Sequence, residues 1–137
     1  MATIERAVAI AATAHDGQRD KAGVPYLLHP LRMMMRMNNP AAMMAAVLHD
    51  VVEDTDWTLD QLRVEGFSAE VLSAVDCLTN RAGESYDEFI ARVQGNEIAR
   101  QVKRADLEDN MDIRRIAELS AKDLARLEKY HRVWLTL

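Results

Sequence analysis

Apolar side chains recur along this chain with a helical period, and no segment alternates as a half-buried strand would. In residues 3–15, Ile4, Ala7, Val8 and Ala11 share one helical face, and Gly17 ends the stretch. Later helices are expected at residues 31–37, 40–55, 59–65, 68–78, 86–93, 96–119 and 120–137, several of them opened by a proline or a capping side chain. The pattern predicts an all-α fold.

The segment between the first two predicted helices, residues 17–29, is unlike an ordinary linker. It carries Arg19, Lys21, Tyr26 and His29, four side chains that can bind ligands. Pro30 follows His29 and should hold it in an extended backbone, because a proline restricts the residue before it. The loop is therefore expected to aim the His29 imidazole in one direction.

A histidine and three carboxylates close the apolar helix that starts near Pro40. Residues four apart lie on one helical face, which pairs His49 with Glu53 and Asp50 with Asp54. Negative charge at a helix C-terminus is opposed by the helix dipole, and a bound cation would remove the repulsion. The segment is either a metal site or a solvated acidic helix end.

Asp106 and Asn110 share a face of the long helix predicted over residues 96–119, with Lys103 one turn earlier; alone, they also fit an ordinary charged helix. Four possible metal ligands emerge from the whole chain: His29, His49, Asp50 and Asp106. A mixed nitrogen and oxygen set suits manganese, iron or zinc better than magnesium or calcium. With open coordination positions, such an ion can activate water, and Glu53 and Asp54 can orient or deprotonate it.

Composition limits the possible classes of protein. The 137 residues, 49% of them apolar, fit a single domain over residues 1–137. The net charge of −5 argues against a general nucleic-acid binder but allows a local basic pocket for a small anion. A single cysteine, Cys77, excludes an internal disulfide. Since no segment is long enough to span a membrane, we expect a cytoplasmic protein.

Several motifs occur in a characteristic order. They are Ala-His-Asp-Gly-Gln at 14–18, Gly-Val-Pro-Tyr-Leu-Leu-His-Pro at 23–30, His-Asp-Val-Val-Glu-Asp-Thr at 49–55, and Lys-Arg-Ala-Asp at 103–106 with Asn-Met at 110–111. This set resembles the HD-domain metal phosphohydrolases, and more closely the hydrolase domain of the RelA/SpoT alarmone enzymes. The chain length resembles the stand-alone small alarmone hydrolases, such as the metazoan SpoT homologue.

The resemblance implies a compact multi-helix HD-domain fold with a central metal site. One Mn²⁺ ion, or another divalent transition metal, would be bound by His29, His49, Asp50 and Asp106, with Glu53 and Asp54 as the catalytic pair. The implied substrate contacts are Lys21, Tyr26, Asn110, Arg126 and Tyr130, together with Arg19 as a nearby cation. The implied reaction removes the 3′-pyrophosphate of (p)ppGpp, giving GDP or GTP and pyrophosphate. No synthetase segment follows, so the chain is expected to degrade the alarmone only.

Departures from the family pattern leave alternatives open. Asp20 occupies the position of an arginine that helps to hold the base, and the residues between Asp106 and Asn110 differ from the usual Arg-Leu-His. A carboxylate near the base makes an adenosine alarmone, (p)ppApp, an alternative substrate. Hydrolysis of another nucleotide and non-catalytic alarmone sensing are further alternatives. Either a monomer or a homodimer is expected.

Overall fold

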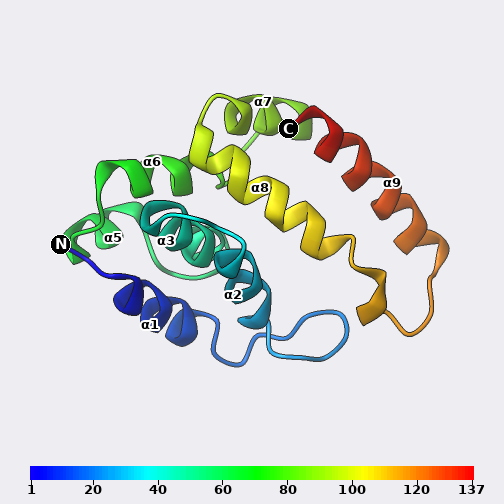
Figure 1. The fold of residues 1–137 in the computed structure, drawn as a ribbon, viewed down its shortest axis with the longest axis horizontal. Helices are drawn as coiled ribbons and strands as arrows, with labels where there is room; N and C mark the ends of the chain where they lie inside the picture. Colours follow the sequence, from blue (N-terminus) through cyan, green and yellow to red (C-terminus); the bar gives the residue numbers. More distant parts are fainter.

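The computed structural model describes residues 1–137 and confirms the predicted all-α class (Figure 1). In chain order the elements are α1 (Ile4–Ala14), α2 (Leu28–Met35), α3 (Pro40–Leu48), α4 (Val51–Asp54), α5 (Leu59–Glu65), α6 (Ala69–Cys77), α7 (Tyr86–Gln94), α8 (Glu97–Asn110), a 3₁₀ turn (Ile113–Arg115) and α9 (Ala121–Thr136). The one strand-like contact is an isolated antiparallel bridge between Arg19 and Pro25. No helix has both the length and the apolar character needed to cross a membrane.

Helix α3 is the central element of the core. Its sequence is apolar on every side, which suits a helix surrounded by others, and it packs against α1, α2, α6 and α8. The neighbouring helices carry small buried side chains: Ala7 and Ala11 on α1, Ala74 on α6, and Ala99 and Ala105 on α8. Because the separation of packed helices depends on the side chains between them, these alanines allow close packing.

The predicted helix over residues 40–55 is interrupted at the His-Asp pair. Helix α3 ends at Leu48, and α4 begins at Val51. His49 Nδ1 contacts the carbonyl oxygen of Ala46 at 2.7 Å, so the side chain takes an acceptor of the last helical turn. The predicted continuous helix through His49 is therefore wrong, whereas the Asp54 amide still donates to the Asp50 carbonyl at 2.9 Å.

The start of α2 also differs from the prediction. The helix begins at Leu28, so His29 is helical rather than extended. The Leu28 and His29 amides donate to the carbonyl oxygens of Pro25 and Tyr26, which forms a tight first turn. Pro30 then lies in this first turn, where the missing N–H costs no helical hydrogen bond. The local preference of a residue before proline is overridden by packing.

Helix α8 ends at Asn110, nine residues before the predicted end. Asp112 leaves the helical conformation, and its carboxylate accepts the Arg114 amide at 3.1 Å, which starts the 3₁₀ turn. The chain then reverses, and α9 runs back alongside α8 (Figure 1). Contacts that hold its C-terminal end include the bond from Arg100 Nη1 to the Leu137 carbonyl at 2.7 Å and the Arg104 guanidinium, which lies 4.4 Å from the Trp134 ring centroid.

One arginine organises the loop between α6 and α7. The half-buried Arg92 guanidinium donates to the carbonyl oxygens of Asp76, Cys77 and Thr79 and to the carboxylate of Glu84. These bonds satisfy carbonyls at the end of α6, where a helix leaves them free. The loop carries Asn80, and its position matters for the site described below.

We predict that Arg92→Ala lowers the free energy of unfolding by about 1.5–3 kcal/mol, because it removes several charge-assisted hydrogen bonds. The matched control is Arg81→Ala, which removes one exposed ion pair with Asp76 at 3.2 Å and should cost at most about 1 kcal/mol. Urea denaturation of both variants measures the difference. Equal losses would mean that Arg92 does not hold the loop.

Candidate metal centre

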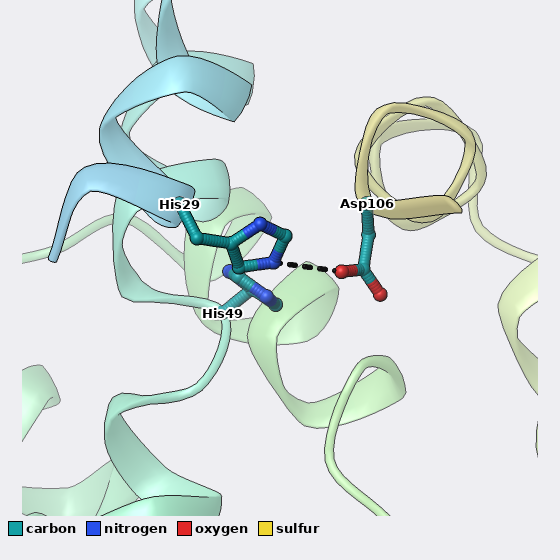
Figure 2. A group of neighbouring side chains, drawn as sticks. All are labelled: His29, His49 and Asp106. Carbon is teal, nitrogen blue, oxygen red and sulfur yellow. Dashed lines mark hydrogen bonds and ion pairs between the residues drawn. The ribbon is translucent and has the colours of Figure 1, made fainter. Parts of the chain in front are cut away.

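Three side chains from three separate helices or helix ends converge in the interior (Figure 2). His29 comes from α2, His49 follows α3 and Asp106 comes from α8, and all three are buried. One ligand atom of each lies within 4.8 Å of the others, and His29 Nε2 is 2.9 Å from Asp106 Oδ1. These are the dimensions of a site that can hold one cation between two imidazoles and a carboxylate.

The outer hydrogen bonds of the two imidazoles direct the same nitrogen inward. His49 Nδ1 donates to the Ala46 carbonyl, which can only accept, and His29 Nδ1 lies 2.6 Å from Asp109 Oδ2. Nε2 is then the nitrogen of each ring that can bind a metal, in His29 once it has lost the proton that it donates to Asp106. His49 Nε2 is fully buried without a hydrogen-bond partner. A buried nitrogen of this kind is costly unless a ligand uses it, so the residues fit a metal cation.

Asp50 connects this group to a second cluster of carboxylates. Its Oδ2 lies 2.9 Å from His49 Nε2, in an ion-pair contact that lacks hydrogen-bond alignment, and accepts the hydroxyl of Tyr26. Oxygen atoms of Asp50, Glu53 and Asp54 lie within 4.8 Å of one another. The structure therefore separates the four predicted ligands into three that face each other and Asp50, which borders both groups.

Asp106 is held by three donors. It accepts from His29, from Lys103 Nζ at 2.8 Å and from Asn110 Nδ2 at 3.1 Å. Burial by itself raises the pKa of Asp106, but the charge of Lys103 and the contacts with the histidines outweigh it and hold this pKa far below its ordinary value. Asp106 is consequently ionised, as a metal ligand must be.

The predicted catalytic pair lies at the rim of the same site. Glu53 Oε1 accepts from the backbone amide of Asn80 at 2.9 Å and from its side-chain amide at 2.7 Å. The loop organised by Arg92 therefore positions Glu53. Burial raises the pKa of Asp54, and the nearby charges of Asp50 and Glu53 raise it further. A carboxylate with a raised pKa is a better proton acceptor.

Two adjoining cavities surround these residues. The inner cavity, of about 280 Å³, is lined by both carboxylate clusters and the two histidines. The outer cavity, of about 710 Å³, is lined by all six predicted substrate contacts: Arg19, Lys21, Tyr26, Asn110, Arg126 and Tyr130. Four residues line both: Asp20, Tyr26, Asn110 and Arg115. Residues that are far apart in the chain thus form one continuous recess.

A family model described as "HD domain" matches residues 7–132 of the chain. The chain belongs to the HD domain family. This membership confirms the resemblance to HD-domain proteins that the ordered motifs indicate. The HD domain here also resembles a solved structure described as a metazoan ortholog of SpoT that hydrolyses ppGpp, with a TM-score of 0.80. That alignment covers 99% of this chain and 85% of the other at 22% identity, so it supports the fold.

Curated relatives share parts of this HD domain. A Streptomyces coelicolor protein named GTP pyrophosphokinase is 42% identical over 80 residues, which is 56% of this chain and 9% of that protein. Proteins named guanosine-3′,5′-bis(diphosphate) 3′-pyrophosphohydrolase match from Haemophilus influenzae, at 43% over 72 residues (49% of this chain, 10% of that protein), and Aquifex aeolicus, at 29% over 120 residues (79% and 17%). The chain therefore spans less than a fifth of the length of these relatives.

The prediction missed two residues that support the metal-site histidines. Asp109 is buried, contacts His29 and accepts from Arg32 Nε at 2.7 Å and Nη2 at 2.9 Å. Burial raises the pKa of Asp109, but His29 and Arg32 outweigh it and lower it well below the ordinary value. Helical spacing could have identified both residues. Asp109 lies three residues after Asp106, and Arg32 lies three residues after His29, so each shares a helical face with a predicted ligand.

We predict that the HD domain binds Mn²⁺ more tightly as the pH rises. Burial lowers the pKa of His29, but its bonds to Asp106 and Asp109 raise it from 6.5 to about 9. A proton must leave Nε2 before a metal binds, so affinity should increase about tenfold per pH unit for each displaced proton, up to about pH 9. Titration calorimetry in several buffers measures both affinity and proton release.

The stability of the metal-free protein should fall, rather than rise, as the pH increases. Because the folded pKa of His29 is raised, its contribution to stability is complete below about pH 6.5 and is lost as the pH passes about 9. Urea denaturation of the protein in the presence of a chelator, below about pH 6.5 and above about pH 9, measures this loss in the free energy of unfolding. A metal affinity that does not change with pH would contradict the assignment of His29 Nε2 as a ligand.

We also predict that Asp109→Asn weakens Mn²⁺ binding about 10- to 100-fold, because the outer partner of a metal-binding histidine sets its orientation and basicity. The control is Glu108→Gln on the adjacent position, whose carboxylate contacts Arg36 and Trp134 outside the two cavities. Metal titration of both variants tests the role of Asp109. An equal, small effect of both substitutions would argue against it.

Proposed function

We propose that this chain is a metal-dependent 3′-pyrophosphohydrolase of nucleotide alarmones that converts (p)ppGpp and water to GDP or GTP and pyrophosphate. The observation that carries the proposal is the pair of adjoining cavities, one rich in metal ligands and the other lined by Arg, Lys and Tyr side chains. The names of the Haemophilus and Aquifex relatives and the description of the metazoan SpoT structure support the same activity.

The two cavities suit the two parts of such a substrate. The inner cavity of about 280 Å³ would receive the 3′-pyrophosphate, with Lys103 and Asn110 on its wall as donors. The outer cavity of about 710 Å³ would receive the nucleoside and its 5′-phosphates, near Lys21, Arg126 and Tyr130. Tyr130 can pack against a base or ribose, and the cations can bind phosphate oxygens.

The proposed cofactor is one Mn²⁺ ion, bound by His29, His49 and Asp106, with Asp50 beside them. This mixed set of ligands suits a transition metal, and zinc or iron would fit the same donors. When bound, such an ion lowers the pKa of a coordinated water and polarises a phosphoryl oxygen. Lys103, the hydrogen-bond partner of Asp106, keeps that carboxylate in position.

Glu53 and Asp54 would orient and deprotonate the attacking water. Asp54, with its raised pKa, accepts the water proton, while Glu53, held by Asn80, orients the water. The water oxygen forms a bond to the phosphorus that carries the ribose 3′-oxygen, and the bond between that phosphorus and the 3′-oxygen breaks. The ribose oxygen takes up a proton, and pyrophosphate leaves. Without both carboxylates, the site would bind the alarmone but turn it over slowly.

The same geometry fits hydrolysis of an adenosine alarmone, because nothing in the reacting group depends on the base. Hydrolysis of a different nucleotide and non-catalytic sensing remain the competing functions. Intact carboxylates at Glu53 and Asp54 favour a hydrolase over a sensor. The proposed substrates are small nucleotides, and we expect the protein not to act on nucleic acid. The site would be the same in a monomer and in a homodimer.

We predict that the purified chain releases pyrophosphate from ppGpp in the presence of Mn²⁺, and that a chelator abolishes this release. The assay compares guanosine and adenosine alarmones side by side and quantifies pyrophosphate and the nucleoside diphosphate. Asp106→Ala should remove both metal binding and turnover. Glu53→Gln should lower kcat about 10²- to 10⁴-fold, as expected for losing a group that assists proton transfer, while metal stays bound.

Three outcomes would contradict parts of this proposal. Full activity of Asp106→Ala would remove that residue from the ligand set. Loss of metal from Glu53→Gln would make Glu53 a ligand rather than a water-positioning group. Tight metal binding with no pyrophosphate release from either alarmone would contradict the proposed reaction and favour another nucleotide substrate or a sensor.

A further inference from the structure

Arg115 occupies the boundary between the two cavities. It is the last residue of the 3₁₀ turn that follows α8, and it lines both the inner and the outer cavity. The other three shared residues, Asp20, Tyr26 and Asn110, carry no positive charge. Arg115 is therefore the only cation common to both cavities.

Both terminal nitrogens of its guanidinium have partners in the protein. Nη2 donates to the Asp109 carbonyl at 2.8 Å and lies 3.6 Å from Asp109 Oδ2, and Nη1 lies 3.4 Å from Asp20 Oδ2. Nε is buried and has no acceptor. A buried N–H without an acceptor costs free energy that a ligand oxygen would recover. The group is thus oriented by the protein but incompletely satisfied by it.

Asp20 is not free to bind a base. Its Oδ1 accepts the backbone amides of Ala22 at 2.8 Å and Val24 at 3.2 Å, and its Oδ2 faces Arg115. These contacts join the loop before α2 to the turn after α8, which lie 95 residues apart in the chain. The interpretation of Asp20 as an acceptor for the amine of adenine therefore has little support from its surroundings.

Three of the other cations near the site already have partners. Lys103 contacts Asp106, and Arg126 Nη2 contacts Asp123 at 2.5 Å. Arg19 Nη1 donates to the Gly23 carbonyl at 3.0 Å within its own loop. Of the three arginines, only Arg115 has a buried donor without a partner. Its ion-pair contacts, 3.4 Å to Asp20 and 3.6 Å to Asp109, are longer than the contact of Arg126.

We propose that Arg115 binds the phosphate attached to the ribose 3′-oxygen, and that Asp20 holds its guanidinium in place. This assignment rests on the proposed function. In a 3′-pyrophosphorylated nucleotide, the 3′-oxygen and its first phosphate connect the part in the outer cavity to the part in the inner cavity. That first phosphate would therefore lie beside the residues that line both cavities. A guanidinium fork matches phosphate oxygens in geometry and in charge.

The test compares Arg115→Gln with Arg114→Gln, its exposed neighbour, which pairs with Asp112 and lines neither cavity. For the alarmone that the wild type hydrolyses, Arg115→Gln should lower kcat/KM about 10- to 100-fold, as for a lost charged hydrogen bond. Arg114→Gln should leave kcat/KM within about twofold, in line with an exposed pair. The kcat/KM of Arg115→Lys should lie between those of the wild type and Arg115→Gln.

Competitive inhibition by the product nucleotide separates this role from a structural one. GDP, or ADP for an adenosine alarmone, lacks the 3′-phosphate, so its Ki should be the same for the wild type and Arg115→Gln. Mn²⁺ affinity and Tm should also be retained. Asp20→Asn should reduce kcat/KM less than Arg115→Gln does. In the double variant, Asp20→Asn should cause no further loss of kcat/KM, because the effects of coupled residues are not additive.

Two results would overturn the assignment. A kcat/KM for Arg115→Gln equal to that of Arg114→Gln, in an active wild type, would exclude Arg115 while leaving the proposed function intact. A product Ki that rises in proportion to the loss in kcat/KM would assign Arg115 to the nucleoside or its 5′-phosphates. A wild type inactive on both alarmones would instead contradict the proposed function, and this assignment with it.

Discussion

The structure depends on burying two imidazoles and a carboxylate inside an apolar helical core. Buried polar atoms are costly unless each has a partner, and a partly satisfied network is worse than none. Here every outward-facing atom of the three has one: Ala46 and Asp109 accept from the histidines, and Lys103 and Asn110 donate to Asp106. The one buried atom of the three without a hydrogen-bond partner is His49 Nε2, and a cation bound among them would use it.

Charge is arranged locally rather than by the balance of the whole chain. The chain carries a net charge of −5, yet the outer cavity balances four cations against four acids: Arg19, Lys21, Arg115 and Arg126 with Asp20, Asp112, Glu118 and Asp123. Two of these acids, Asp20 and Asp123, hold Arg115 and Arg126 in place, so fewer side-chain rotamers have to be ordered when an anion binds. A polyanionic substrate is therefore compatible with an acidic protein.

Local signals in the sequence predicted local structure well. Thr58, Ser85 and Ser120 were predicted to begin helices, and each caps its helix in the structure, because a cap depends only on residues up to three positions away. The failures lie where distant contacts compete with local preference. His29 became helical, the helix broke at His49, and α8 ended at Asn110. All three places border the candidate metal centre.

By itself, the sequence determined the helical class, the ordered motifs and the types of ligand, since periodicity and spacing report on the backbone within a few turns. Only the tertiary structure decided which side chains meet. It brought Asp109 to His29 across 80 residues and Arg115 to Asp20 across 95, and it gathered the six predicted substrate contacts on one cavity. The physical reason is that the packing of α2, α3 and α8 against one another sets these distances, and no local pattern encodes that packing.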